Sequence, residues 1–335
     1  MRTARRPPPV SGKLDVALVI PAWNDAEGLA RLLDQVAGFG CFGQVVVVDD
    51  GSDAPVVPHR SLPDLVVLRH AASRGPGIAR NSGLAAVTAR HVLFFDADDL
   101  LTQDIVFLLE DLACDLQVAA RPFDFCLFRY ADSRTAAEER WGQPDWDDRL
   151  WREAGVSVGV LEELPPAGWP ILARTANYPW NKIYRTAFLR DHSIAFGTSR
   201  VHEDVAPHWR GFLAAQRIVV SNRICAWHQV SRAHSRLTNL AGEDRLAVFA
   251  ALDEVAATMT AQVSPLWRAA FAEFALGLVD WNHSIIDPAL WPQLRAGEQR
   301  FVQNRMLGWG RQLAQDHPAL WARIAQRSGL QGSAP

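Results

Sequence analysis

Lysine, cysteine and long apolar runs are all scarce in this sequence of 335 residues. Only two of its 34 basic residues are lysines, Lys13 and Lys182, and the remaining 32 are arginines. Because such a skew is usually a coding bias, the abundance of arginine alone does not indicate phosphate binding. A lysine that stands against this bias is more informative, and Lys182 is therefore a candidate site residue.

Four further absences restrict the class of protein. The formal net charge is only −3, so we expect no nucleic-acid partner. No apolar run approaches the roughly 18 residues needed to span a bilayer. The first nine residues, with three arginines and three prolines, lack the apolar core of a signal peptide. The four cysteines are scattered without a C-x-x-C pair, which favours reduced thiols and a cytoplasmic location.

The order of apolar segments predicts an α/β fold over residues 14–240, after a disordered arm at 1–13. Over residues 14–130, short β-branched runs alternate with helical periodicity, which is typical of a mostly parallel sheet flanked by helices. We expect strands at 16–20, 45–48, 65–68, 91–95 and 123–130, and helices from about 25, at 77–87 and at 102–112.

The rest of the chain has a different pattern. Residues 131–240 have long loops and a short helix over 131–180, a helix at 181–190, and short strands at 217–220 and 224–228. From 241 to 330 the periodicity is helical throughout, which predicts an all-helical extension.

Polar residues gather where the predicted strands end. Asp49 and Asp50 follow the second strand, and Asp96, Asp98 and Asp99 follow the fourth. Each alone could be a turn or capping residue. Together they would repel one another without a cation, and ligands of open α/β sheets bind at the carboxyl ends of the strands. The pattern therefore predicts a site for a divalent metal and a nucleotide.

The spacing of Asp96 and Asp98 suits a metal ion. Alternate residues of an extended segment point to the same side, so both carboxylates can face one hard cation. Mn²⁺ or Mg²⁺ prefers such oxygen ligands and can neutralise a diphosphate leaving group.

Four segments resemble the family-2 glycosyltransferases with the GT-A fold: VIPAWNDAEGLARLL, VVVVDDGS, SRGPGIARNSGL and VLFFDADD. The resemblance continues through PWNKIYR at 179–185 and HED at 202–204. It implies that 14–130 is the nucleotide-binding half of the domain and 131–240 the acceptor half. It implies a bacterial enzyme that transfers a sugar, with inversion, from a nucleotide-diphosphate sugar to a glycan or lipid-linked acceptor. UDP is the favoured nucleotide, and synthesis of cell-surface polysaccharide or lipopolysaccharide is the expected setting.

The resemblance also implies roles for single residues on the nucleotide side. Pro21 and Trp23 would lie beside the nucleobase, where an aromatic ring can stack. Asp50 would recognise the base imide, and Asp96 the ribose or the metal. Arg80 would flank the nucleotide, and a salt bridge from Arg80 to Asp50 or Asp96 is a compatible alternative.

On the metal and acceptor side, Asp98 resembles the metal ligand and Asp204 the base that deprotonates the acceptor hydroxyl. The alternative for Asp204 is an acidic residue that stabilises a helix N-terminus. Glu203 would orient the acceptor or nearby backbone. His202 is expected to face solvent, with a contact to the metal or a phosphate as the alternative. His228 could complete the metal site or be structural.

Two residues of the PWNK segment are candidate donor or acceptor contacts. Lys182 could bind donor phosphate or sugar hydroxyls, and its alternative is an exposed helix residue paired with a carboxylate. Trp180 could be a platform for a sugar or a packing residue.

The function of the helical extension stays open. Its apolar faces with interspersed arginines, such as Phe301 beside Arg305, fit packing on the catalytic unit, a homodimer, or peripheral contact with the inner face of the membrane. A catalytically silent module that binds a nucleotide-sugar or glycan is the alternative to an enzyme.

Overall fold

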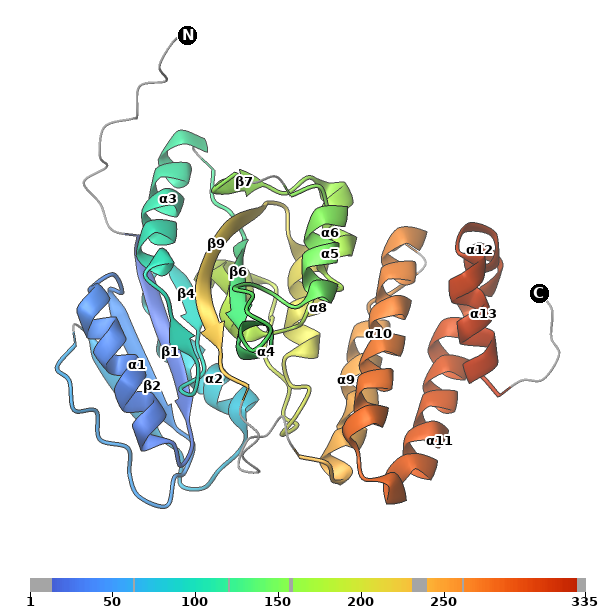
Figure 1. The fold of residues 1–335 in the computed structure, drawn as a ribbon, viewed down its shortest axis with the longest axis horizontal. Coiled ribbons are helices and arrows are strands. Elements are labelled where there is room, and N and C mark those ends of the chain that lie inside the picture. The colour runs from blue at the N-terminus through green and yellow to red at the C-terminus, as the bar shows by residue number, and fades with distance from the viewer. Residues whose placement is uncertain are drawn as a thin grey trace, which may run out of the picture.

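The structure is a computed structural model that describes residues 14–62, 64–119, 121–156, 159–230, 240–260 and 262–329. An α/β unit occupies one side of the molecule and a group of helices the other (Figure 1). One sheet, in the order β3-β2-β1-β4-β8-β6-β9-β5 with β7 beside β9, runs through the α/β unit.

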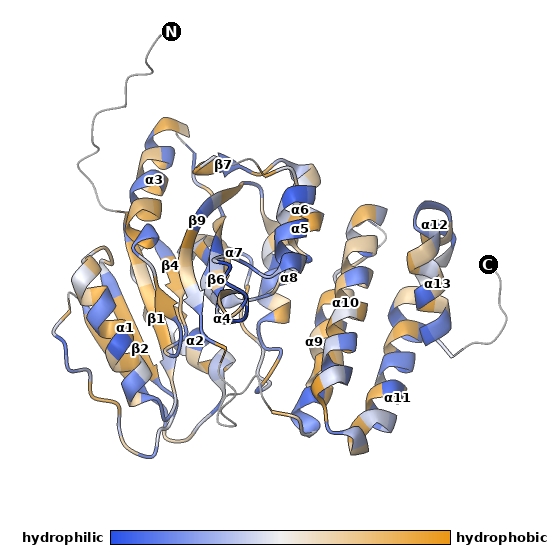
Figure 2. Cartoon of the chain, in the orientation of Figure 1, coloured by the Kyte–Doolittle hydropathy of each residue, from blue (hydrophilic) through white to orange (hydrophobic). Residues whose placement is uncertain are grey.

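The first four strands are parallel, as predicted. They are β1 (Val16–Ala22), β2 (Gln44–Asp49), β3 (Leu65–Arg69) and β4 (His91–Phe94). Every residue of β2 and β4 is buried, because apolar side chains on both faces meet helices. The orange strands at the centre of Figure 2 are this apolar layer.

Helices on both faces cover these strands. They are α1 (Ala26–Phe39), α2 (Pro76–Ala86) and α3 (Asp104–Ala119). The Asp25 side chain caps α1 by accepting from the amide of Gly28, and Gly40 ends the helix in the left-handed conformation with φ 56°. The third helix continues past residue 112, where the sequence analysis ended it.

The second half of the sheet makes it mixed rather than mostly parallel. Its strands are β5 (Leu100–Leu101), β6 (Phe125–Asp132), β7 (Leu161–Glu163), β8 (Lys182–Arg185) and β9 (Ile218–His228). The predicted helix at 181–190 is wrong over its first half, because β8 is inserted antiparallel between β4 and β6. The helix α7 (Thr186–Asp191) begins only after this strand. The two strands expected near 217–228 are one strand whose register against β6 shifts.

Short helices fill the connections of this half. They are α4 (Ser133–Ala136), α5 (Asp145–Glu153), α6 (Trp169–Leu172) and α8 (Val205–Ala214), with 3₁₀ turns at Pro166–Gly168 and Pro179–Asn181.

The C-terminal region is helical, as predicted. It contains α9 (Val248–Ala256), α10 (Pro265–Ile285), α11 (Trp291–Phe301), α12 (Gly310–Asp316) and α13 (Pro318–Arg327). Short 3₁₀ and π segments join them, at Glu243–Ala247, Pro288–Leu290, Val302–Met306 and Leu307–Trp309. We call residues 243–327 the helical unit.

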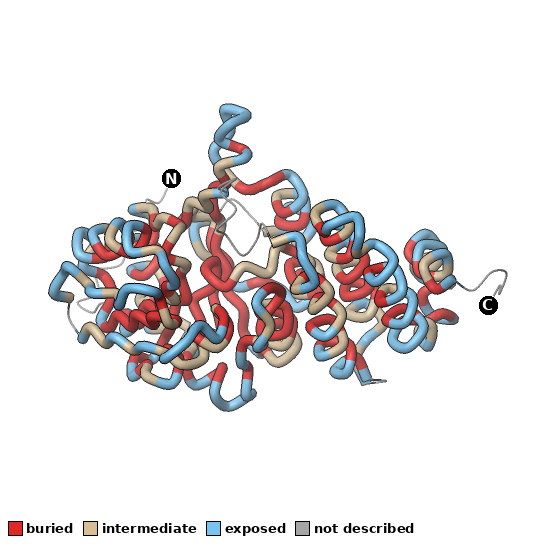
Figure 3. The backbone as a smooth tube through the Cα atoms, turned by 90° about the horizontal axis from the view of Figure 1, so that it is seen from below, coloured by how far each residue is buried: buried red, intermediate tan, exposed pale blue. Residues whose placement is uncertain are grey.

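The helical unit packs directly on the α/β unit. Trp209 of α8 is fully buried, and its ring meets Phe271 and Phe274 of α10, with 5.2 Å between ring centroids in each case. Buried residues form a continuous core through both units, drawn red in Figure 3. Within the part of the chain described, no helix is both long and apolar enough to cross a membrane.

Candidate active site

Three aspartates form an acidic cluster just beyond the end of β4. Asp96, Asp98 and Asp99 each offer a carboxylate oxygen, and these oxygens lie within 4.8 Å of one another. Asp99 is buried, whereas the other two are half-buried. Oxygen donors this close together suit a hard divalent cation. The parallel sheet thus delivers the predicted carboxylates to one place.

Asp99 is the member of the cluster that the protein itself holds most firmly. Its carboxylate accepts from Nδ1 of His228 at 3.0 Å and from the amide of Gln229 at 2.9 Å. Burial alone would lower the pKa of His228, but the charge and hydrogen bond of Asp99 raise it above its ordinary value. His228 is not one of the three residues that share the cation geometry, so its role as a metal ligand stays a prediction.

Arg80 connects the acidic cluster to a distant part of the chain. Its guanidinium donates to Asp96 at 2.6 Å and to Glu203 at 2.7 Å, and only 3% of its surface is exposed. The ion pair with Asp96 is one that the sequence predicts as an alternative to a nucleotide contact, whereas the ion pair with Glu203 was not predicted. Burial acts to lower the pKa of Arg80, and the two carboxylates together raise it, so the cation is permanent.

Close packing of α2 places Arg80 there. A Cβ on Gly77 would lie 2.1 Å from the carbonyl oxygen of Gly197, so only glycine lets the helix approach this loop. One turn later, the side chain of Asn81 forms two hydrogen bonds of 2.9 Å with the backbone of Phe196. The Phe196 ring also lies beneath the Arg80 guanidinium, 5.3 Å from its centroid.

Asp204 follows Glu203 at the start of α8 and is half-buried. It makes no capping hydrogen bond with its side chain. Burial and the neighbouring Glu203 charge raise the pKa of Asp204 to about 8, against the opposing effect of Arg80 and Lys182. A carboxylate that holds a proton this strongly is a good proton acceptor once ionised.

Lys182 is not the exposed helix residue of the alternative prediction. It begins β8, is 1% exposed, and its Nζ donates to the carbonyl of Tyr178 and to Oδ1 of Asn181, both at 2.7 Å. Burial lowers its pKa to about 7, although the charges of Asp204 and Asp147 act in the opposite direction. Direct contact with the donor stays a prediction.

Trp180 packs rather than presents a face. It is 1% exposed and stacks on Tyr178 with 4.5 Å between centroids, while Tyr130 lies edge-on at 5.0 Å. The sequence left open a sugar platform and a packing residue, and in the structure Trp180 is a packing residue. His202 was expected to face solvent, and that is wrong: it is 7% exposed and bonded to Asn282 of α10.

Asp50 organises the loop before α2. Its carboxylate accepts from Nδ1 of His70 at 2.6 Å, from the Ser73 hydroxyl at 2.8 Å and from the amides of Arg74 and Gly75 at 3.0 and 2.8 Å. His70 is a site residue that sequence reasoning missed, because a single histidine after an edge strand carries no motif.

Trp23 lies on the loop after β1, beyond the half-buried Pro21, and 41% of its surface is exposed. The next residue, Asn24, has a left-handed backbone with φ 52°, and it bonds to Ser52 and Asp53 of the following strand end. These bonds fix the loop and leave the indole accessible, as a stacking role requires.

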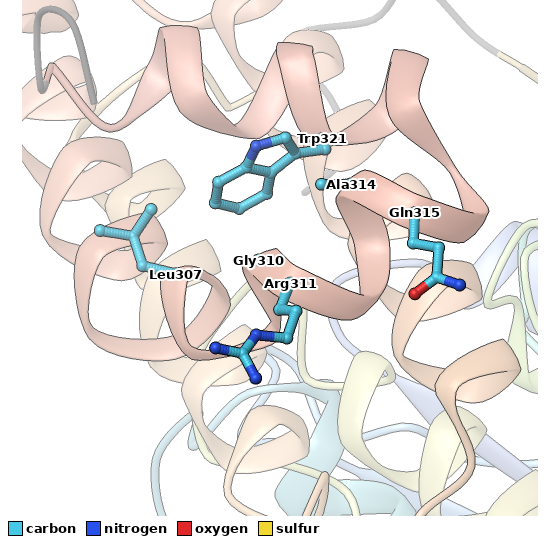
Figure 4. A pocket seen from close by; sticks show the side chains of 6 residues that line it. All are labelled: Leu307, Gly310, Arg311, Ala314, Gln315 and Trp321. Atoms are coloured by element: carbon cyan, nitrogen blue, oxygen red, sulfur yellow. The ribbon is translucent and has the colours of Figure 1, made fainter. Parts of the chain in front are cut away.

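Two hollows among the described residues lie away from this site. One, of about 620 Å³, lies among α12, α13 and the preceding turn, where Figure 4 shows Trp321 near Gly310 and Arg311. Another, of about 670 Å³, lies where β4 begins and β8 ends, and four arginines line it: Arg90, Arg121, Arg185 and Arg190. Neither includes the acidic cluster.

Comparison with known proteins agrees with this geometry. Residues 17–132 match the family described as Glycosyl transferase family 2. The segment 17–132 is therefore similar to family-2 glycosyltransferases, and the fold is like that of neighbours with the GT-A fold. A crystal structure of S. aureus TarS 1–349 in complex with UDP-GlcNAc has a TM-score of 0.72 and 20% identity, over 94% of this chain and 88% of that one.

Curated relatives match over shorter stretches. The pre-mycofactocin glycosyltransferase of Mycobacterium tuberculosis is 45% identical over 96 residues, which are 28% of this chain and 20% of that protein. The succinoglycan biosynthesis protein ExoO of Rhizobium meliloti is 36% identical over 104 residues, 29% of each chain. The glycosyltransferase YibD of Escherichia coli is 26% identical over 206 residues, 57% of this chain and 54% of that one. The chain therefore aligns with about half or less of each relative.

Proposed function

We propose that this protein is a metal-dependent, inverting glycosyltransferase that moves a sugar from a UDP-sugar to a hydroxyl group of a glycan or lipid-linked acceptor. The observation that carries the proposal is the buried Arg80, which joins Asp96 of the acidic cluster to Glu203, the neighbour of Asp204. A cation site and a basic carboxylate are thereby held on one connected network, as a single displacement reaction requires.

The acidic cluster is the part of the site that fits a divalent metal. Asp98 and Asp96 are the expected ligands, while Asp99 is held by His228. When bound, Mn²⁺ or Mg²⁺ would neutralise the diphosphate leaving group. Arg80 supplies a fixed positive charge on the same side of the site, and its two ion pairs keep Asp96 in place.

Asp204 is the group that would take the proton from the acceptor hydroxyl as its oxygen attacks the anomeric carbon. The bond from the sugar to the diphosphate breaks on the opposite side, so the configuration inverts. Its raised pKa makes Asp204 a stronger base than an exposed aspartate, and the permanent charge of Arg80 favours its ionised form.

Trp23 and Asp50 support the nucleotide end of the proposal. The exposed indole can stack on a base, and Asp50 fixes the loop Ser73–Gly75 through hydrogen bonds to its carboxylate. UDP is favoured because the TarS structure of the same fold was solved with UDP-GlcNAc.

A donor screen tests the proposal. UDP-, GDP- and dTDP-sugars are incubated with the protein and Mn²⁺, and release of the nucleoside diphosphate is measured. We expect hydrolysis or transfer with a UDP-sugar, and we expect Asp98→Asn to reduce it strongly at a limiting Mn²⁺ concentration. Binding of a UDP-sugar without turnover under any acceptor condition would favour the silent binding module instead.

The acceptor belongs to the proposal only as a class. The bacterial relative ExoO is named for succinoglycan biosynthesis, which supports a polysaccharide as acceptor. Contact with the cytoplasmic membrane surface and a homodimer also stay proposals, to be tested by vesicle flotation and by light scattering.

A further inference from the structure

One buried polar pair joins the helical unit to the residue just before Glu203 and Asp204. Asn282 of α10 is 0% exposed, and its Nδ2 donates to the carbonyl of Leu278 at 2.8 Å. Its Oδ1 lies 3.0 Å from Nε2 of His202. Because an amide oxygen can only accept, His202 donates this hydrogen bond and carries its proton on Nε2.

The backbone at His202 needs this kind of support. Its φ is 66°, a left-handed conformation that residues with a Cβ adopt rarely and keep only where the surroundings hold them. The turn it creates is closed by the amide of Gly197, which donates to the Glu203 carbonyl at 2.8 Å, and by that of Val205, which donates to the His202 carbonyl at 3.3 Å. The conformation of His202 therefore determines where α8 starts.

The helical unit encloses the imidazole on more than one side. Trp281 lies edge-on to the His202 ring, with 6.1 Å between centroids. Arg245, which is 1% exposed, lies over the Trp281 ring at 4.7 Å and donates to the Leu240 carbonyl at 2.7 Å. Burial and the nearby Arg245 charge lower the pKa of His202 to about 4, so it stays a neutral donor in ordinary buffers.

We propose that the helical unit is a positioning element of the active site, in which Asn282 holds His202 and thereby fixes the turn that carries Glu203 and Asp204. Its consequence for catalysis rests on the proposed function, in which Asp204 is the base. The mechanical part, that Asn282 fixes the turn, rests on the geometry alone and can be tested without turnover.

The experiment compares three variants of the full chain. Asn282→Leu removes the acceptor at similar volume, and Asn282→Asp keeps an acceptor oxygen. Ser328→Ala is the matched control, because Ser328 is buried directly after α13 and its hydroxyl donates to the Ala325 carbonyl of that helix. Thermal melting establishes that each variant is folded at the assay temperature.

The first readout is hydrogen exchange of the Gly197 and Val205 amides. We expect Asn282→Leu to speed their exchange at least about tenfold, while Asn282→Asp and Ser328→Ala stay near wild type. The second readout is turnover, for which we expect Asn282→Leu to lower kcat by about 10- to 100-fold with the donor KM within about twofold.

The outcomes separate the two proposals. If exchange of the turn is unchanged in a folded Asn282→Leu protein, Asn282 does not position it and the inference is overturned. If exchange rises but the wild type transfers no sugar from any donor, the positioning stands and the proposed function fails. Equal loss of kcat in Ser328→Ala would indicate general destabilisation and would also overturn the inference.

Discussion

Arg80 and Glu203 are 123 residues apart in the chain, yet their side chains form an ion pair of 2.7 Å that is almost closed to solvent. The same guanidinium binds Asp96 at 2.6 Å. The buried positive charge of Arg80 therefore compensates two carboxylates, one from each half of the α/β unit. Separately, neither half would contain the complete set of charges.

Replacing Arg80 by methionine should destabilise the protein. Glu203 would become a buried charge without a partner, a situation that costs roughly 3–5 kcal/mol. Urea denaturation followed by circular dichroism measures the change. Arg210→Met is the control, because its pair with Glu254 is exposed and should contribute about 0–1 kcal/mol. The double variant Arg80→Met/Glu203→Gln should recover part of the loss, and strictly additive effects would contradict the pairing.

Asp204→Asn should abolish most turnover without loss of donor affinity. Loss of a general base typically lowers the rate by about 10²- to 10⁴-fold. Transfer to acceptor and calorimetric binding of UDP-GlcNAc measure the two quantities. Asp253→Asn, at an exposed ion pair with Arg305, is the matched control. Unchanged kcat in the Asp204 variant would remove this residue from the mechanism.

Transfer should increase with pH through the pKa of Asp204, which burial and Glu203 raise to about 8. A base works only when ionised, so activity is lost as the pH falls below this value and is complete above it. The pH dependence of kcat/KM between 6 and 9.5 tests the prediction. A profile that stays flat across this range would show that another group takes the proton.

Asp98→Asn should weaken the affinity of the site for the metal ion and leave the fold intact. One charged ligand is lost, so the Mn²⁺ concentration for half-maximal activity should rise by about tenfold or more. Titration of Mn²⁺ into protein treated with a chelator measures it, with thermal melting to confirm folding. Asp111→Asn is the control: Asp111 lies on α3 and pairs with Arg223 of β9, and its replacement should leave the Mn²⁺ titration unchanged.

Lys182 should make stability depend on pH. Burial lowers its pKa from 10.5 to about 7, so between these values the unfolded chain binds the proton and the folded chain does not. The free energy of unfolding contributed by this group therefore rises as the pH rises from about 7 to 10. Denaturation of wild type and Lys182→Met is measured at pH 7 and 9.5. The free energy of unfolding of the wild type should increase relative to that of the variant as the pH rises. The same difference in free energy of unfolding at both pH values would contradict the presence of a buried neutral amine.

The parallel strands and the acidic cluster were predictable, because valine-rich runs ending in aspartate are local features of the sequence. The strand β8 was not, since its four residues KIYR have no alternating pattern and are extended only because β4 and β6 lie on either side. Pairing between positions far apart in the chain leaves no such local trace.

Long-range polar contacts escaped prediction for the same reason. The rarity of lysine drew attention to Lys182, but its burial comes from the packing of Tyr178 and Asn181 around it. Asn282 and His202 come from segments 80 residues apart, and nothing in either segment indicates the other. Arg80 was assigned to the site through its motif, whereas its partner Glu203 was assigned a different role.

The place of β8 between β4 and β6 has a practical consequence for the protein as it is synthesised. The segment 17–132 that matches the family includes both neighbours but not the strand that joins them. A nascent chain that has emerged only to residue 132 would expose two unsatisfied sheet edges across a gap one strand wide. Expression of that segment alone should therefore yield aggregates, and the shortest fragment worth producing must extend at least through β9.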